Sequence, residues 1–215
     1  MINERLRFKP ISQQFAEFTV GKDVIDDNGH LNYEPRLGFC LDAASAMLQK
    51  EELFPFQELD IRYVREVMEG DSLTITTTAD FSEKEVKLRQ KMQRGNDLVT
   101  GTTLVAGGDV ILWDPLSEIR VFEEDRRLYL KRHGLTIEGL RQNGVFIYIA
   151  RLHMKYDTKK LLEEPKLETK PLKDAKIQFR QQRGPTTSVC TIAVVTPGDT
   201  TTNKDDVIKR IVSAV

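Results

Sequence analysis

The chain has 215 residues, 40% of them hydrophobic and 30% charged, which is an ordinary composition for a globular protein with one large core or two small ones. Its 32 Lys and Arg residues nearly balance 33 Asp and Glu residues, and the formal net charge is -1. Because nucleic-acid-binding domains are usually strongly basic, this balance argues against a nucleic-acid partner. No apolar run reaches membrane-spanning length and Met1–Arg5 is polar, so we expect a cytoplasmic protein with no membrane partner.

The chain contains two cysteines, Cys40 and Cys190, which lie far apart within apolar periodic segments. This placement predicts buried free thiols in a reducing compartment, and we expect neither a disulfide nor a metal site. Neither cysteine is accompanied in the sequence by a histidine placed to activate its thiol, so the sequence gives no support for a thiol nucleophile.

In chain order, Phe15–Val20 predicts a short strand, which is followed by a break at Gly21. Pro35 is expected to open a helix that runs to Lys50. Its apolar residues recur at three- and four-residue spacing, namely Leu37, Cys40, Leu41, Ala44, Met47 and Leu48. Alternation of apolar and polar residues then predicts strands at Leu59–Tyr63, Leu73–Thr77, Val86–Leu88 and Leu98–Val105. One helix followed by an antiparallel meander is the simplest assembly of these elements.

The second part of the chain predicts the same order of elements. A helix is expected at Val121–His133 and a short one at Thr136–Gln142, and the strand Val145–Tyr156 follows. The final Asp205–Val215 has helical spacing and is interpreted either as a docking helix or as a frayed tail.

Short segments recur between the two parts, which indicates an internal duplication. Leu152–Tyr156 echoes Leu59–Tyr63, Ile177–Gln181 echoes Val86–Gln90, and Arg183-Gly184 echoes Arg94-Gly95. Short strand patterns also recur by chance in β-rich chains, but we favour a true duplication.

The chemistry of the chain is concentrated in one segment, Asp26–Tyr33, with the sequence DDNGHLNY. An acid, a glycine turn, a histidine and an asparagine stand here directly before the predicted helix. The N-terminus of a helix offers unpaired backbone N–H groups and the positive end of the helix dipole. A carboxylate in that setting suits attack on a carbonyl whose oxygen becomes negative.

Three motifs of this chain resemble a known family. They are Asp26-x-x-Gly29-His30-x-Asn32, the helical pair Ala43-Ala44, and Tyr63-Val64-Arg65-Glu66-Val67-x-x-Gly70-Asp71. Together they resemble the hotdog-fold acyl-CoA thioesterases of the 4-hydroxybenzoyl-CoA thioesterase type, and the loop is most similar to that of the betainyl-CoA thioesterase branch. The resemblance covers Phe15 to Asp114 in motif detail and Val121 to Thr196 only in pattern.

The resemblance also implies an architecture, because this family wraps a five-stranded antiparallel sheet around one long helix and works as a dimer. We therefore expect an α+β double hotdog, each half an antiparallel β-sheet wrapped around a central α-helix. Residues 1–112 would form a first repeat that carries the Asp26 motif. Residues 113–215 would form a second, degenerate repeat with a C-terminal helix. The chain would be an intrachain pseudo-dimer, with a homo-oligomer as a further possibility.

The activity implied by the resemblance is hydrolysis of a small acyl-CoA or acyl-carrier-protein thioester. Asp26 would act as nucleophile or as general base for water. Gly29 would let the backbone approach the ligand, and its own N–H or a neighbouring one would bind the oxyanion. His30 would position the loop or form a hydrogen bond with the substrate. Each residue also has a purely structural interpretation. Asp26 could be an acidic turn residue, Gly29 could form a tight turn, and His30 could tie the loop to the helix. Coenzyme A enters only as part of the substrate, and no separate cofactor is expected.

The candidate substrate-binding residues are Asn32, Tyr33, Phe54, Phe56 and Arg62. Asn32 could equally cap the coming helix, and the three aromatic residues could equally be core. A cationic acyl group of the betainyl kind would want an aromatic cage, and Arg62 could meet the phosphates of coenzyme A. The short connection containing Phe54 and Phe56 could also shorten or plug the acyl pocket.

Two rival functions remain open from the sequence. The second half has an acid at Asp114-Pro115-Leu116-Ser117 but no following Gly-His, so we expect at most one competent site per chain. A non-catalytic acyl-thioester-binding or scaffold protein is the first rival. A hotdog enoyl-CoA hydratase or dehydratase, which would also use an acid and a histidine, is the second.

Overall fold

The computed structural model of the protein describes residues 13–26, 29–48, 56–82, 85–107, 114–157, 165–196 and 204–212. Its first part comprises β1 (Gln13–Thr19), the short 3-10 helix η1 (Lys22–Val24), α1 (Tyr33–Met47), β2 (Phe56–Tyr63), β3 (Ser72–Phe81), β4 (Glu85–Arg94) and β5 (Asp97–Gly107). The second part comprises α2 (Pro115–Arg132), α3 (Ile137–Gln142), β6 (Phe146–Tyr156), β7 (Lys166–Leu172), β8 (Lys176–Arg183), β9 (Thr186–Val195) and α4 (Lys204–Val212).

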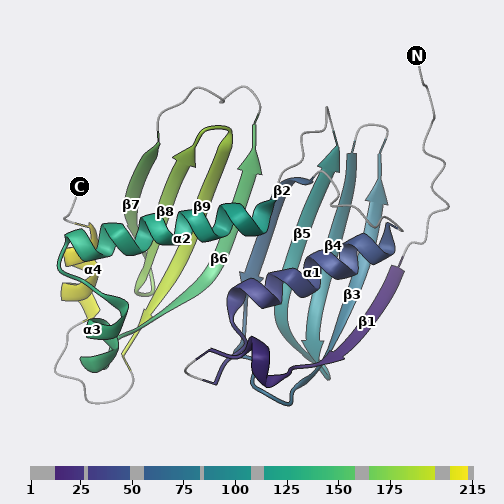
Figure 1. Cartoon of the computed structure of the whole chain (residues 1–215), viewed down its shortest axis with the longest axis horizontal. Coiled ribbons are helices and arrows are strands. Elements are labelled where there is room, and N and C mark those ends of the chain that lie inside the picture. Colours follow the sequence, from purple (N-terminus) through teal and green to yellow (C-terminus); the bar gives the residue numbers. More distant parts are fainter. Residues whose placement is uncertain are drawn as a thin grey trace.

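The strands of the described residues form one antiparallel sheet in the order β1-β3-β4-β5-β2-β6-β9-β8-β7. Helices α1 and α2 lie side by side across the same face of this sheet, one over each half (Figure 1). The expected α+β class, with a sheet around a central helix in each half, is confirmed. Within the described residues the sheet around α2 has four strands instead of the expected five. The predicted boundary between residues 112 and 113 lies outside the described residues.

Helix α1 begins two residues before the predicted start at Pro35. Asn32 is its N-cap, and the Asn32 Oδ1 accepts the Glu34 N–H at 3.4 Å. The face turned to the sheet carries Leu37 and Cys40, which are fully buried, and small residues such as Ala44 allow the sheet to pack closely. The predicted end of this helix at Lys50 lies outside the described residues.

Helix α2 begins at Pro115, six residues before the predicted start at Val121. The Asp114 carboxylate caps it by accepting the N–H groups of Leu116 and Ser117 at 3.0 and 3.3 Å. The acid that the sequence analysis considered as the start of a second acidic loop is therefore a helix cap. An acid followed by proline and serine is also typical of a turn, and for this reason the predicted start of the helix lies too late. Among the described residues, none of the helices combines the length and apolarity needed to span a bilayer.

The recurring segments occupy equivalent places in the two halves. Gln90 on β4 donates its side-chain N–H to the carbonyl of Cys40 on α1 at 2.7 Å, and Gln181 on β8 donates to the carbonyl of Phe122 on α2 at 2.9 Å. Each half therefore tethers its central helix to the sheet by the same buried amide. Cys40 and Cys190 are both buried free thiols, as predicted.

The two halves are joined by antiparallel pairing of β2 with β6, in the middle of the sheet. On the face turned to the helices, Leu59 lies opposite Met154 and Ile61 opposite Leu152, and all four are buried. On the other face, the Arg151 guanidinium binds both carboxylate oxygens of Asp60 at 2.8 and 2.7 Å, and the His153 Nε2 lies 3.0 Å from the Glu58 carboxylate. The seam is thus apolar on one side and ionic on the other.

The Asp60–Arg151 pair predicts a pH-dependent contribution to stability. Burial alone would raise the pKa of Asp60, but the hydrogen bonds and charge of Arg151 outweigh it and lower that pKa below its ordinary value. A carboxylate with a lowered folded-state pKa stabilises the fold above its unfolded pKa, and this contribution is lost as the pH falls through the folded value.

We expect Asp60→Asn to lower the free energy of unfolding at pH 7 by up to about 1 kcal/mol, since the pair is partly exposed. The difference from the wild type should shrink as the pH falls below about 4. Urea denaturation between pH 7 and 3.5 measures it, with Asp42→Asn on the exposed side of α1 as the control. A deficit that stays constant over this range would contradict the ion-pair explanation.

Candidate active site

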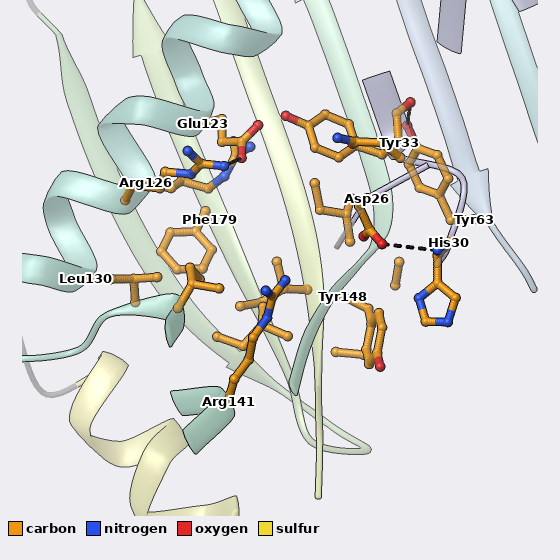
Figure 2. Close-up of a pocket in the computed structure, with 18 of the residues that line it drawn as sticks. Asp26, His30, Tyr33, Tyr63, Glu123, Arg126, Leu130, Arg141, Tyr148 and Phe179 are labelled. Atoms are coloured by element: carbon orange, nitrogen blue, oxygen red, sulfur yellow. Dashed lines mark hydrogen bonds and ion pairs between the residues drawn. The ribbon is translucent and has the colours of Figure 1, made fainter. Parts of the chain in front are cut away.

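Three hydrogen bonds hold the Asp26–His30 turn. The Asp26 N–H donates to the His30 carbonyl at 2.8 Å, and the Gly29 N–H donates to the Asp26 carbonyl at 2.9 Å. The Asp26 carboxylate accepts the His30 N–H at 3.1 Å, the dashed line of Figure 2. Gly29 has a φ of 79°, a left-handed conformation that glycine adopts without strain. The turn therefore holds the Asp26 side chain in one place, and the Gly29 N–H is used inside the turn.

Arg36 lies near the start of α1 and holds the chain directly after the Asp26 turn. Its side chain is only 4% exposed. The Arg36 Nη2 donates to the carbonyl of Leu31 at 3.3 Å, and its Nη1 donates to the carbonyl of Arg65 at 3.1 Å. Its guanidinium also lies 5.4 Å from the centre of the Tyr63 ring, a cation–π contact. The helix, the Asp26 turn and the segment after β2 are thus held together by one side chain.

His30 and Glu66 meet at the same end of the site. The His30 Nε2 lies 3.5 Å from the Glu66 Oε2, and the backbone of His30 forms an isolated β-bridge with Met68. His30 therefore ties the loop to the segment around Met68 and not to the helix, and its ring borders the same space as Asp26.

Tyr148 on β6 faces this end from the second half of the chain. Its pKa is raised by burial and by the negative charges of Glu66 and Asp26, while Arg141 opposes the shift. A tyrosine with a raised pKa keeps its proton at neutral pH, so Tyr148 is available as a hydrogen-bond donor. Figure 2 shows it below Asp26 and beside His30, with Arg141 further toward α3.

A cavity of about 860 Å³ lies where these residues meet. Its volume falls within the range typical of small-molecule sites. The first half contributes the polar end, with Asp26, His30 and Glu66. The second half contributes an apolar interior, made by side chains that include Leu130, Leu135, Ile147, Ile149, Phe179 and Ile192. The cavity therefore crosses the seam, and both halves are needed to form it.

The candidate binding residues are placed differently from one another. Asn32 and Tyr33 line the cavity, and Asn32 also caps α1. Arg62 is exposed on the face of the sheet opposite the helices and does not line the cavity. Phe56 is buried at the start of β2, also away from the cavity, and Phe54 lies outside the described residues. The connection between residues 49 and 55 lies outside the described residues, so the expected plug is tested only at Phe56, which does not line the cavity.

Several lining residues were not singled out from the sequence. Glu66 belongs to the motif quoted for the family resemblance, and that motif was the available signal for it. Tyr148, Arg126 and Arg141 come from the second half, where the sequence shows no motif, so only the folded chain brings them to Asp26. Glu123 of α2 also borders the cavity. Among the described residues, no group of three or more His, Cys, Asp or Glu side chains is arranged to hold a metal ion.

Comparison with known proteins gives one family match to the first half of the chain and several similar folds. The model of the acyl-ACP thioesterase C-terminal domain matches residues 9–106. An acyl-ACP thioesterase from Bacteroides thetaiotaomicron superposes with a TM-score of 0.58 at 10% identity, covering 84% of this chain and 98% of that one. The 12:0-ACP thioesterase from Umbellularia californica superposes with a TM-score of 0.60 at 5% identity, covering 86% and 95%. No curated protein sequence matches the chain. The fold is therefore the hotdog fold of thioesterases, with both halves represented in the solved structures.

The left-handed conformation of Gly29 gives a test of how tightly the turn is held. An alanine at this position would make only an ordinary contact, 3.6 Å from the Met68 Cε, so its cost lies in the backbone. We expect Gly29→Ala to lower the free energy of unfolding by about 1–2 kcal/mol, the cost of a non-glycine residue in this region. Chemical denaturation measures the loss.

Gly38 supplies the matched control for this substitution. It lies within α1 without a positive φ, and an added Cβ there would have no neighbour within 4 Å. Gly38→Ala is expected to raise the free energy of unfolding by about 0.5–1 kcal/mol through helix propensity. Equal and small effects of the two substitutions would show that the turn is not held in the left-handed conformation.

Proposed function

We propose that the protein is a thioesterase that hydrolyses an aliphatic acyl thioester, with Asp26 as nucleophile or general base. The observation that carries this proposal is the Asp26 carboxylate at the wall of a cavity with one polar and one apolar end. A thioester substrate has the same division, since a polar reacting carbonyl is joined to an apolar chain. The match of residues 9–106 to a thioesterase domain supports the proposal independently of the cavity.

Asp26 carries the central chemical role in this proposal. Either its carboxylate attacks the thioester carbonyl and water later hydrolyses the anhydride, or it takes a proton from the attacking water. In both cases the thiolate of the carrier leaves and a free carboxylic acid is produced. The hydrogen bond from the His30 N–H fixes the orientation of the carboxylate, so the reacting oxygen is positioned before the substrate binds.

The surrounding polar groups supply positioning and charge stabilisation. Glu66 lies against the His30 ring and orients it. The oxyanion is met by the N-terminal end of α1, where Tyr33 lines the cavity, and by the protonated hydroxyl of Tyr148 on the opposite wall. Because the Gly29 N–H is bonded within the turn, its contribution is the backbone conformation.

The size and charge of the cavity indicate the kind of acyl group. A volume of about 860 Å³ exceeds what a small acyl group would fill, so we propose a longer aliphatic chain that extends under α2. The betainyl group is a cation, and six cationic side chains of the described residues line the cavity against four acidic ones, with the guanidinium groups of Arg36 and Arg126 buried. The acyl group is therefore uncharged or anionic, and its carrier is coenzyme A or acyl carrier protein.

The test is a panel of acyl-CoA substrates from short to long chains, assayed by detection of the released thiol. We expect hydrolysis by the wild type and a loss of about 100-fold or more in kcat for Asp26→Asn, because the amide can neither attack nor accept a proton. Asp23→Asn is the matched control, since Asp23 is an exposed acid of η1 that does not line the cavity.

Other outcomes of the same panel identify the rival functions. Binding of acyl-CoA without hydrolysis of any substrate would replace the thioesterase by a scaffold or binding protein. Hydration of an enoyl-CoA, lost in Asp26→Asn, would replace it by a hydratase. An Asp26→Asn enzyme with unchanged hydrolysis would assign the chemistry to another residue.

A further inference from the structure

Arg126 is a buried cation that the proposed hydrolysis does not use. It projects from α2, lines the cavity and is only 6% exposed. Its Nη1 donates to the Gln181 Oε1 at 2.7 Å, whereas its Nη2 is buried without a hydrogen-bond partner among the described residues. Nor does any carboxylate within the described ranges form an ion pair with it. A buried charge without a counter-ion is strongly unfavourable, which points to an anionic partner supplied from outside the chain.

The first half of the chain shows that the fold itself does not require this arginine. Its central helix is tethered by the same buried amide contact, from Gln90 to the carbonyl of Cys40. Four residues after Cys40 comes Ala44, and four residues after Phe122 comes Arg126. The same position of the repeat is thus filled by a fully buried alanine in one half and by a cation in the other.

A second donor of the cavity wall also lacks a partner. The hydroxyl of Tyr33, at the start of α1, is buried and has no hydrogen-bond partner among the described residues. Figure 2 shows the Tyr33 ring extending from α1 toward Glu123 and Arg126 of α2. The carboxylate of Glu123 is bound by Arg127 at 2.5 Å. A cationic donor and a hydroxyl donor therefore border one cavity, and neither the Arg126 Nη2 nor the Tyr33 hydroxyl is hydrogen-bonded to Glu123 or to any other described residue.

The surroundings of Arg126 define the rest of the ligand. Figure 2 shows its guanidinium above the ring of Phe179, on the side of the cavity away from Asp26 and His30. Leu130 and Ile192, like Phe179, line this part and are almost fully buried. In such apolar surroundings an ionic hydrogen bond is stronger than in water. The ligand is thus expected to be an apolar chain that carries an anionic oxygen group remote from the reacting carbonyl.

We propose that the cavity binds an acyl chain with a distal carboxylate, which means the half-thioester of an aliphatic dicarboxylic acid, and that Arg126 holds this carboxylate with the hydroxyl of Tyr33 as second donor. The proposal rests on the proposed function in one respect, since it places the thioester at Asp26. Two sources of ligand, the half-thioester and a free fatty acid, have a carboxylate on an apolar chain in common. A free fatty acid bound in the reverse direction would present the same group to Arg126.

The first experiment compares kcat/KM for ω-carboxyacyl-CoA and unsubstituted acyl-CoA substrates of equal chain length, from six to twelve carbons. We expect the wild type to prefer the ω-carboxyacyl substrates, and Arg126→Met to lower their kcat/KM roughly 10- to 100-fold, the usual effect of one ionic hydrogen bond. The unsubstituted substrates should be hydrolysed at least as well by the variant. Arg126→Lys, which keeps the cation, should retain part of the preference, and Arg132→Met at the exposed end of α2 should retain all of it.

The second experiment measures binding without hydrolysis, by calorimetric titration of sebacate, decanoate and 1-decanol. We expect both carboxylates to bind the wild type more tightly than the alcohol does, and Arg126→Met to abolish this difference. Thermal melting of each variant shows whether it is folded.

The results separate the possible failures. Dependence of carboxylate binding on Arg126, without any preference for ω-carboxyacyl-CoA, would overturn the dicarboxylic half-thioester and assign the group to a free fatty acid. Equal behaviour of wild type and folded Arg126→Met in both experiments would overturn the site altogether. Absence of hydrolysis for every substrate would refute the proposed function alone, because the binding experiment still decides whether Arg126 binds a carboxylate.

Discussion

The buried guanidinium of Arg36 is the constraint on which the geometry of the site depends. Placing a charge there is costly, and the cost is offset by the carbonyls of Leu31 and Arg65 and by the face of Tyr63. Leu31 directly follows the Asp26 turn, Tyr63 ends β2 and Arg65 follows it, so one side chain of α1 sets the distance between these segments. Glu66 and His30 are neighbours for the same reason, since each lies next to a backbone group that Arg36 holds.

The pairing of β2 with β6 turns two similar halves into one asymmetric site. The first half supplies the charged turn, and its central helix is packed by the fully buried Leu37, Cys40 and Ala44. The second half leaves a cavity beneath α2, and this cavity opens toward Asp26 across the seam. The two halves therefore contribute differently to the cavity. The first half places the Asp26 turn at its wall, and the second half supplies most of its apolar lining.

The sequence predicted the order of the elements through β6, where each has a local signal, but it predicted no strand at β7, whose residues alternate lysine and glutamate with few apolar positions. Alternation identified the strands, and three- and four-residue spacing identified α1. The predicted start of α2 lies too late, because an acid followed by Pro115 and Ser117 is also typical of a turn. The Asp26 turn could be found from a motif of consecutive residues. Tyr148 and Arg126 could not, since their meeting with Asp26 depends on pairing between strands far apart in the chain and on the packing of α2.

The two buried arginines show how a structural cation differs from one placed to bind a ligand. Both terminal nitrogens of Arg36 donate to backbone carbonyls of the chain, and only its Nε, within the guanidinium stem, is buried without a partner among the described residues. One terminal nitrogen of Arg126 donates to Gln181, and the other has no acceptor within the described residues. Burial is nearly equal, at 4% and 6% exposed, so the environment costs each charge a similar desolvation. The incomplete bonding of Arg126, at the wall of a cavity, is therefore the feature that points to a ligand rather than to the fold.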